Sequence, residues 1–231
     1  GGINFINRSQ PLFSVYKYSP FPYTDNHLTS KIVSSVCADR QGNLWIGMDE
    51  GEIDLFRKGK QVDCYNNRNK NLSGAPIQAS LCDSKGGLWF GLFYGGILYY
   101  DAQIRNFKQI LPPAQSHVDV RAFHEDKEGN IWTSTSEGIY QIDRNTHKIK
   151  AHYGSTNDLV RCIVKDSEGQ LWVGYFGGGL TIFDESFNPI ASFNVAGQFP
   201  SNTLNALYED SKGRMWAATG DGLVCFPSLK K

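Results

Sequence analysis

The segment DRQGNLWIG, residues 39–47, occurs five times in this 231-residue chain with small variations. Each copy places a glycine three residues after an aspartate, a tryptophan six residues after it and a second glycine twelve residues after it. The five copies contain every tryptophan of the protein: Trp45, Trp89, Trp132, Trp172 and Trp216. Spacings of 44, 43, 40 and 44 residues between these tryptophans indicate an array of supersecondary units. The repeat therefore decides the fold.

Each repeat predicts four short strands. An alternating stretch such as VSSVCA (33–38) precedes the aspartate, the tryptophan lies in a second strand, and a glycine-containing loop leads to a third and a less regular fourth strand. The Asp-x-x-Gly segment predicts a turn, because the carboxylate accepts nearby backbone amides and glycine adopts positive φ. With no helical periodicity, the pattern predicts an all-β fold: a β-propeller of four-stranded antiparallel blades. The tryptophans are expected to fill the space between neighbouring blades.

The whole chain, residues 1–231, is predicted to be a single propeller region with about five blades. The repeats are expected at about 28–71, 72–115, 116–155, 156–198 and 199–231. Residues 1–24 are expected to supply outer strands of a preceding or closing blade, because GGINF (1–5) resembles a third strand and LFSVYKY (12–18) a fourth. Two interpretations remain open: a closed five-bladed ring, or a fragment of a larger array.

Composition argues against several classes of function. Twenty-three basic and twenty-three acidic residues balance, so we expect no nucleic-acid binding, and no apolar run is long enough to span a bilayer. The five cysteines and five histidines share no metal-ligand spacing, so neither a metal site nor a cofactor is predicted. Catalytic motifs are also missing from the sequence, and no catalytic residue is predicted. His117 and His124 with Glu125 come nearest to an acid–base cluster, but His124 is expected to point along its strand rather than into the propeller mouth.

Candidate ligand-binding residues come from two sets of positions. The position five residues before each repeated aspartate is always polar, on the predicted innermost strand: Ser34, Gln78, Arg121, Arg161 and Asn205. Such a ring could hydrogen-bond a sugar or an anion, with the arginines as fork-shaped donors. The loops between second and third strands, which open on the same face, add Asp49, Glu50, Phe93, Tyr94, Tyr175, Phe176 and Asp221. Aromatic faces beside carboxylates suit carbohydrate. The alternatives are a water-filled polar channel and a rim that contacts an adjacent domain.

The repeats resemble those of the two-component regulator propeller family, whose pattern is an Asp, a Gly-Asn, a Leu-Trp-Ile-Gly and a Gly-Gly-Ile or Gly-Gly-Leu. The fullest matches are Asp39 to Gly47 with Gly51, Asp83 to Ile97, and Asp166 to Leu180, while Ser134 and Ala218 depart from the pattern. The resemblance implies a periplasmic sensor region of a hybrid histidine kinase, in which such repeats form seven-bladed propellers. It also implies an adjacent propeller or β-sandwich domain, a membrane helix and a kinase, all outside this chain.

The resemblance thus implies an extracytoplasmic ligand-binding propeller of a two-component system that regulates transcription in response to an oligosaccharide. No catalysis is expected in this region, since the kinase chemistry lies elsewhere in the intact protein, which is expected as a homodimer. Two other functions stay open: a protein-interaction scaffold, and a propeller lyase or hydrolase of the kind found among antibiotic-inactivating lyases.

Overall fold

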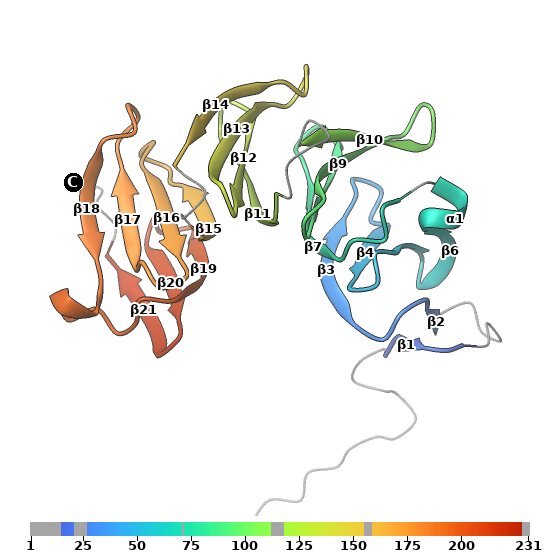
Figure 1. Ribbon diagram of the computed structural model, residues 1–231, viewed down its shortest axis with the longest axis horizontal. Coiled ribbons are helices and arrows are strands. Elements are labelled where there is room, and N and C mark those ends of the chain that lie inside the picture. The colour runs from blue at the N-terminus through green and yellow to red at the C-terminus, as the bar shows by residue number, and fades with distance from the viewer. Residues whose placement is uncertain (1–14, 21–26, 71, 112–117, 155–158, 228–231) are drawn as a thin grey trace, which may run out of the picture.

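A computed structural model of the chain describes residues 15–20, 27–70, 72–111, 118–154 and 159–227 (Figure 1). Apart from the short helix α1 (Asn67–Lys70) and a 3-10 turn at Val195–Gly197, the regular structure of these residues is β-strand. The predicted all-β class is confirmed.

Five antiparallel sheets follow one another along the chain, and we call each sheet a blade. Blade 1 comprises β3 (Val33–Ala38), β4 (Leu44–Met48), β5 (Ile53–Arg57) and β6 (Lys60–Tyr65). Blade 2 comprises β7 (Ile77–Cys82), β8 (Leu88–Leu92), β9 (Gly96–Asp101) and β10 (Asn106–Leu111). Blade 3 comprises β11 (Val120–Glu125), β12 (Asn130–Thr135), β13 (Gly138–Asp143) and β14 (Ile149–Tyr153). Blade 4 comprises β15 (Val160–Lys165), β16 (Leu171–Tyr175), β17 (Leu180–Phe183) and β18 (Pro189–Phe193). Blade 5 comprises β19 (Leu204–Glu209), β20 (Met215–Thr219) and β21 (Gly222–Phe226). Strands pair in sequence order within each blade, and a short parallel pair, β1 (Lys17–Tyr18) and β2 (His27–Leu28), precedes blade 1.

The repeated aspartate organises the turn between the first and second strands. In blade 3, Asp126 Oδ1 accepts the backbone amide of Asn130 at 2.7 Å, and Oδ2 accepts the indole N–H of Trp132 at 2.7 Å. Gly129, at φ 80°, donates its amide to the Asp126 carbonyl at 2.9 Å. The other four aspartates accept from their own tryptophans at 2.7 to 3.2 Å. The spacing of six residues therefore reflects a hydrogen-bonded unit that closes each turn.

The tryptophans of blades 1–4 lie between blades, as predicted. The Trp45 ring lies 4.8 Å from the ring of Tyr100 in blade 2, and the Trp172 ring lies 5.1 Å from that of Phe226 in blade 5. The indoles of blades 2 and 3 belong to apolar clusters shared with the following blade. Trp216, in blade 5, is only partly buried. The apolar core is thus divided into layers between successive blades.

The first strands β3, β7, β11, β15 and β19 lie side by side in this order and form the inner edge of the array. Figure 1 shows the blades as an open arc with blade 1 at one end and blade 5 at the other. The end strands are correspondingly exposed: Val36 on β3 is 60% exposed and Tyr208 on β19 is 67% exposed. The structure therefore shows an open arc and not a closed five-bladed ring.

Candidate binding groove

Every inner strand contains a β-bulge at the polar ring position. In β11, Val120 pairs with Thr135 and Ala122 pairs with Ser134, so Arg121 is left out of the ladder. The same irregularity occurs at each of the other ring positions, namely Ser34, Gln78, Arg161 and Asn205. A bulge leaves one residue unpaired and re-aims its side chain, and bulges are frequent next to functional sites. The five ring positions thus share one backbone feature.

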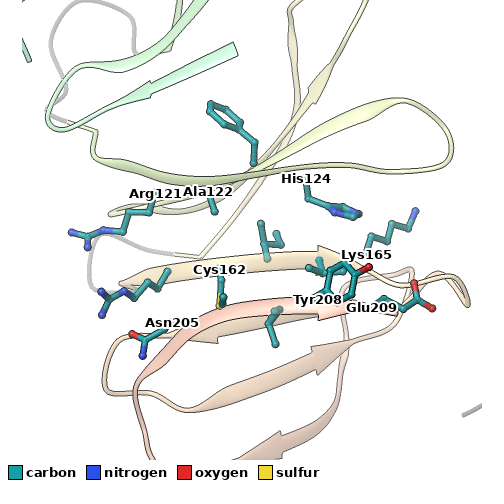
Figure 2. Close-up of a pocket in the computed structure, with 14 residues that line it drawn as sticks. Arg121, Ala122, His124, Cys162, Lys165, Asn205, Tyr208 and Glu209 are labelled. Atoms are coloured by element: carbon teal, nitrogen blue, oxygen red, sulfur yellow. The ribbon is translucent and has the colours of Figure 1, made fainter. Parts of the chain in front are cut away.

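A groove of about 470 Å³ runs along β11, β15 and β19. Arg121, Arg161 and Asn205 line it, and Figure 2 shows Arg121 and Asn205 at the same end of their strands. This volume lies within the range of about 300 to 1,000 Å³ that is usual for small-molecule sites. The structure therefore brings three of the five predicted ring residues together in one concave site.

Arg121 is held in place by a buried carboxylate. Its guanidinium forms an ion pair with Asp119, whose side chain is only 2% exposed, whereas the Arg121 side chain is 31% exposed. Burial raises the pKa of Asp119 above its ordinary value, even though the neighbouring guanidinium acts in the opposite direction. Asp119 Oδ1 and Arg121 Nε have no hydrogen-bond partner among the described residues. The pair fixes the direction of Arg121 without using all of its hydrogen-bonding capacity.

Arg161 stacks on an aromatic ring from the predicted rim. Its guanidinium carbon lies 5.4 Å from the ring centre of Phe176, a cation–π distance. Phe176 is 55% exposed, and its backbone is fixed by a bridge to Thr203, the residue before β19. An exposed aromatic face and a guanidinium therefore lie side by side at the groove.

Ser34 and Gln78 lie on β3 and β7, outside the groove. The Ser34 hydroxyl donates to the Gly47 carbonyl at 3.0 Å and is also in contact with the Ile77 carbonyl, so it ties blade 1 to blade 2. Gln78 Oε1 is buried without a hydrogen-bond partner among the described residues. Ser34 is thus engaged by the backbone.

The loops between second and third strands lie at the same end of each blade as the start of the first strand, as predicted. The amide of Asp49 donates to the Ile32 carbonyl at 3.1 Å, and that of Phe176 to the Leu159 carbonyl at 2.9 Å. Both carbonyls immediately precede a first strand. These bonds place the rim residues around one mouth.

None of the predicted rim residues is part of the groove lining: Phe176 adjoins the groove through Arg161, and the others lie elsewhere. The rings of Phe93 and Tyr94 contact each other with centres 4.1 Å apart and planes tilted by 52°, and Tyr175 packs against the apolar cluster between blades 3 and 4. Glu50 lines a second cavity of about 360 Å³ beside α1. Asp49 and Asp221 are exposed on their loops. Of the predicted loop residues, Phe176 contacts a groove arginine, Arg161.

The far end of the groove contains residues that sequence reasoning did not select as ligand-binding. His124, Lys165, Tyr208 and Glu209 line it, and Figure 2 shows them at the end opposite Arg121. Burial lowers the pKa of His124, despite nearby carboxylates that act in the opposite direction. A signal was present in the sequence, because the position just before the repeated aspartate is charged only in the last three copies, as Glu125, Lys165 and Glu209.

His124 and Glu125 do not converge. His124 lines the groove at the end opposite the arginines, and so away from the mouth, as expected from the sequence. Glu125 instead accepts the backbone amide of Ser84 in blade 2 at 2.6 Å and pairs with Arg144. His117 lies outside the described residues. The candidate acid–base cluster is therefore not assembled by the residues that the structure places.

The described residues offer neither a metal centre nor a membrane-spanning helix. They contain no group of three or more His, Cys, Asp or Glu side chains arranged to hold a metal ion. In the same residues, no helix has the length and apolarity needed to cross a membrane.

The radial blades, the inner strands and the bulge-directed groove define a β-propeller region. Residues 27–50, 154–177 and 198–221 match the family model described as two component regulator propeller. Three of the five repeats thus match the two-component regulator propeller family, as the sequence predicted. No match was found among curated protein sequences.

Solved structures agree with this assignment. The extracellular domain of a hybrid two-component system from B. thetaiotaomicron is 42% identical, with a TM-score of 0.83, over 93% of this chain and 29% of that one. A second such domain from the same organism is 18% identical, with a TM-score of 0.75, over 90% of this chain and 28% of that one. Virginiamycin B lyase from Staphylococcus aureus shares the fold at 16% identity and a TM-score of 0.66, over 86% of this chain and 70% of that one. The chain thus spans less than a third of the length of the first two relatives.

Proposed function

We propose that this chain is part of the periplasmic ligand-sensing region of a two-component signalling protein, that it responds to an oligosaccharide, and that the signal passes to a kinase outside this chain. The observation that supports this most is the 42% identity, over 93% of the chain, to the extracellular domain of a hybrid two-component system. On this proposal the region itself has no catalytic role, and transcription is regulated by other parts of the intact protein.

The groove supports an oligosaccharide as the ligand. Arg121, Arg161 and Asn205 supply several hydrogen-bond donors and acceptors for hydroxyl groups, and Phe176 supplies an exposed ring face for the apolar face of a sugar. The exposed Tyr94 on blade 2 offers a second ring at the rim, two blades away from Phe176. Concave sites of this kind place a few polar groups on a largely apolar surface.

We propose that the partners of this region lie in the intact protein. They are an adjacent propeller or β-sandwich domain, and a second copy in a homodimeric sensor. The exposed strands at the two ends of the arc, β3 and β19, offer surface for the first kind of contact.

Calorimetry with a panel of oligosaccharides tests the sensing proposal. At least one glycan is expected to bind, and Phe176→Ala or Arg121→Ala is expected to weaken that binding by tenfold or more. Ile190→Ala, an equally exposed position on the outer strand β18, should bind as the unmodified chain does. If no glycan binds, the oligosaccharide proposal is wrong.

An interaction scaffold is the second candidate function. It is favoured by the exposed apolar side chains at the arc ends, among them Val36, Tyr208 and Leu223 at 60%, 67% and 64% exposure. The lyase alternative has only the shared fold in its favour, because the identity to virginiamycin B lyase is 16%.

A further inference from the structure

The arginine end of the groove carries positive charge that the described residues do not neutralise. Asp119 pairs with Arg121, but Arg161 has no carboxylate partner among the described residues and lies against the ring of Phe176. Beside the paired Arg121, a cation without a described carboxylate partner therefore lines the concave site. Because a guanidinium binds a carboxylate or a sulfate through two parallel N–H donors, such a site favours an anionic group.

The opposite end of the groove is already balanced. Lys165 Nζ lies 3.1 Å from Glu128 Oε2 and 3.8 Å from Asp126 Oδ2. Glu209 accepts the backbone amide of Ser167 at 2.9 Å. An anion in the groove would therefore bind at the arginine end, where the positive charge is not cancelled by described carboxylates.

Arg121 is preorganised for this role. Its pairing with the buried Asp119 fixes the side chain, so little conformational entropy is lost when a ligand binds. The guanidinium still presents donors to the groove, since the side chain is 31% exposed. Asp119 is in this sense a positioning residue, and Arg121 is the group that would touch the ligand.

We propose that the groove binds an acidic saccharide, with its carboxylate or sulfate between Arg121 and Arg161 and a sugar face against Phe176. Asn205, on the adjacent strand β19, hydrogen-bonds a neighbouring hydroxyl. The inference rests on the proposed sensing function and narrows its ligand to an anionic class.

The test compares matched ligands on the full 231-residue chain by calorimetry. The probes are trigalacturonic acid, its neutral methyl ester and a chondroitin sulfate disaccharide. We expect at least one acidic probe to bind ten times more tightly than the methyl ester, with affinity that falls as salt rises. The ranking of the carboxylate and sulfate probes identifies the anion.

Variants assign this binding to the groove. Arg161→Gln should weaken binding of the acidic probe by tenfold or more. Arg161→Lys should restore part of the lost affinity, because lysine returns the positive charge without the two parallel N–H donors of the guanidinium. Arg105→Gln is the matched control, since its side chain is 74% exposed on the turn between β9 and β10. Circular dichroism melts of each variant should match the unmodified chain.

Two results would overturn the proposal, and they are distinguishable. If the methyl ester binds as well as the acid and Arg161→Gln has no effect, the anionic ligand class is wrong while oligosaccharide sensing stands. If none of the probes and no other glycan binds, both the ligand class and the sensing proposal are wrong.

Discussion

A single aspartate holds together the turn and the tryptophan of each repeat. Burial alone would raise the pKa of Asp126, but hydrogen bonds from Asn130 and Trp132 outweigh it and hold the pKa below its ordinary value. The ionised carboxylate is therefore the form that stabilises the fold. This chemistry explains why an aspartate is found at this position in all five copies.

Asp126→Asn is expected to destabilise the protein by about 1 to 3 kcal/mol at pH 7, because the amide cannot accept every hydrogen bond that the carboxylate does. Since the folded-state pKa is lowered, this stabilisation is present above the unfolded pKa of about 4 and is lost as the pH falls through the lower folded value. Urea unfolding should thus show a difference from the unmodified chain at pH 7 that shrinks towards pH 3. Glu50→Gln, at an exposed loop position, is the control. A difference that does not depend on pH would contradict this account.

In blades 1, 2 and 4, the glycine two residues after the tryptophan marks a close approach between blades. A methyl group on Gly91 would lie 2.5 Å from Cγ1 of Val120, on the inner strand of blade 3. Gly91→Ala should destabilise the protein by about 1 to 3 kcal/mol, the usual cost of overpacking. Gly197→Ala is the control, because its nearest neighbouring atom lies 3.9 Å away. Equal melting temperatures for the two variants would show that the blades can separate to admit the methyl group.

The sequence predicted the turn and core residues of the repeat better than it predicted the residues of the groove. Turn and core residues recur at fixed spacing, so five copies reveal their role. The role of a ring position depends on what surrounds it in the folded chain. Ser34 and Arg121 occupy equivalent bulges in blades 1 and 3, yet Ser34 binds backbone carbonyls while Arg121 faces the groove. The groove residues His124 and Lys165 were not selected, because they do not recur in every copy; the only trace of that end of the groove is the charged position before the aspartate in the last three copies.

Successive blades are joined by aromatic rings as well as by the repeated tryptophans. Tyr65, at the end of β6, lies with its ring centre 5.6 Å from that of Tyr100 on β9, and Phe193 on β18 lies 5.1 Å from Phe226 on β21. A ring from a fourth strand thus rests on a ring from the next third strand. Tyr16 makes the same kind of contact with Phe56 on β5, at 5.2 Å. Residues before β1 lie largely outside the described chain, so their predicted strands stay predictions.

The burial of each tryptophan depends on the blade that follows it, and this gives a prediction at the scale of the blade. Trp89 is 0% exposed, so Trp89→Ala should cost about 3 to 5 kcal/mol. Trp216 keeps its hydrogen bond to Asp210 but is only partly buried, so Trp216→Ala should cost clearly less. Urea denaturation of the two variants measures the difference. Equal losses of unfolding free energy would mean that the hydrogen bond in the turn, and not the packing between blades, accounts for the stabilisation by the tryptophan.

At the scale of the whole molecule, the arc ends in two apolar faces. Val36 on β3 and Leu223 on β21 are 60% and 64% exposed, whereas no residue of the inner strands β7 and β11, which correspond to β3, is exposed. Exposed apolar sheet faces favour association. Figure 1 shows that these faces belong to opposite ends of the arc.

The isolated 231-residue chain is therefore expected to self-associate in a concentration-dependent way. Val36→Glu or Leu223→Glu should shift it towards the monomer in analytical ultracentrifugation. Ile104→Glu, at an equally exposed position on the turn between β9 and β10, should leave the association unchanged. Sedimentation that is the same for all three variants would assign the association to another surface.

The bulge in each inner strand places the residue that can bind a ligand outside the hydrogen-bonded pairs that build the blade. Because the side chain at Gln78, Arg121, Arg161 or Asn205 stands outside the cross-strand ladder, exchanging it removes no pair from the sheet. Substitutions at these positions can therefore change the binding chemistry of the mouth one blade at a time, while the turns and the core layers between blades stay unchanged. A combinatorial library at these four positions should accordingly yield mostly folded proteins that differ in what they bind.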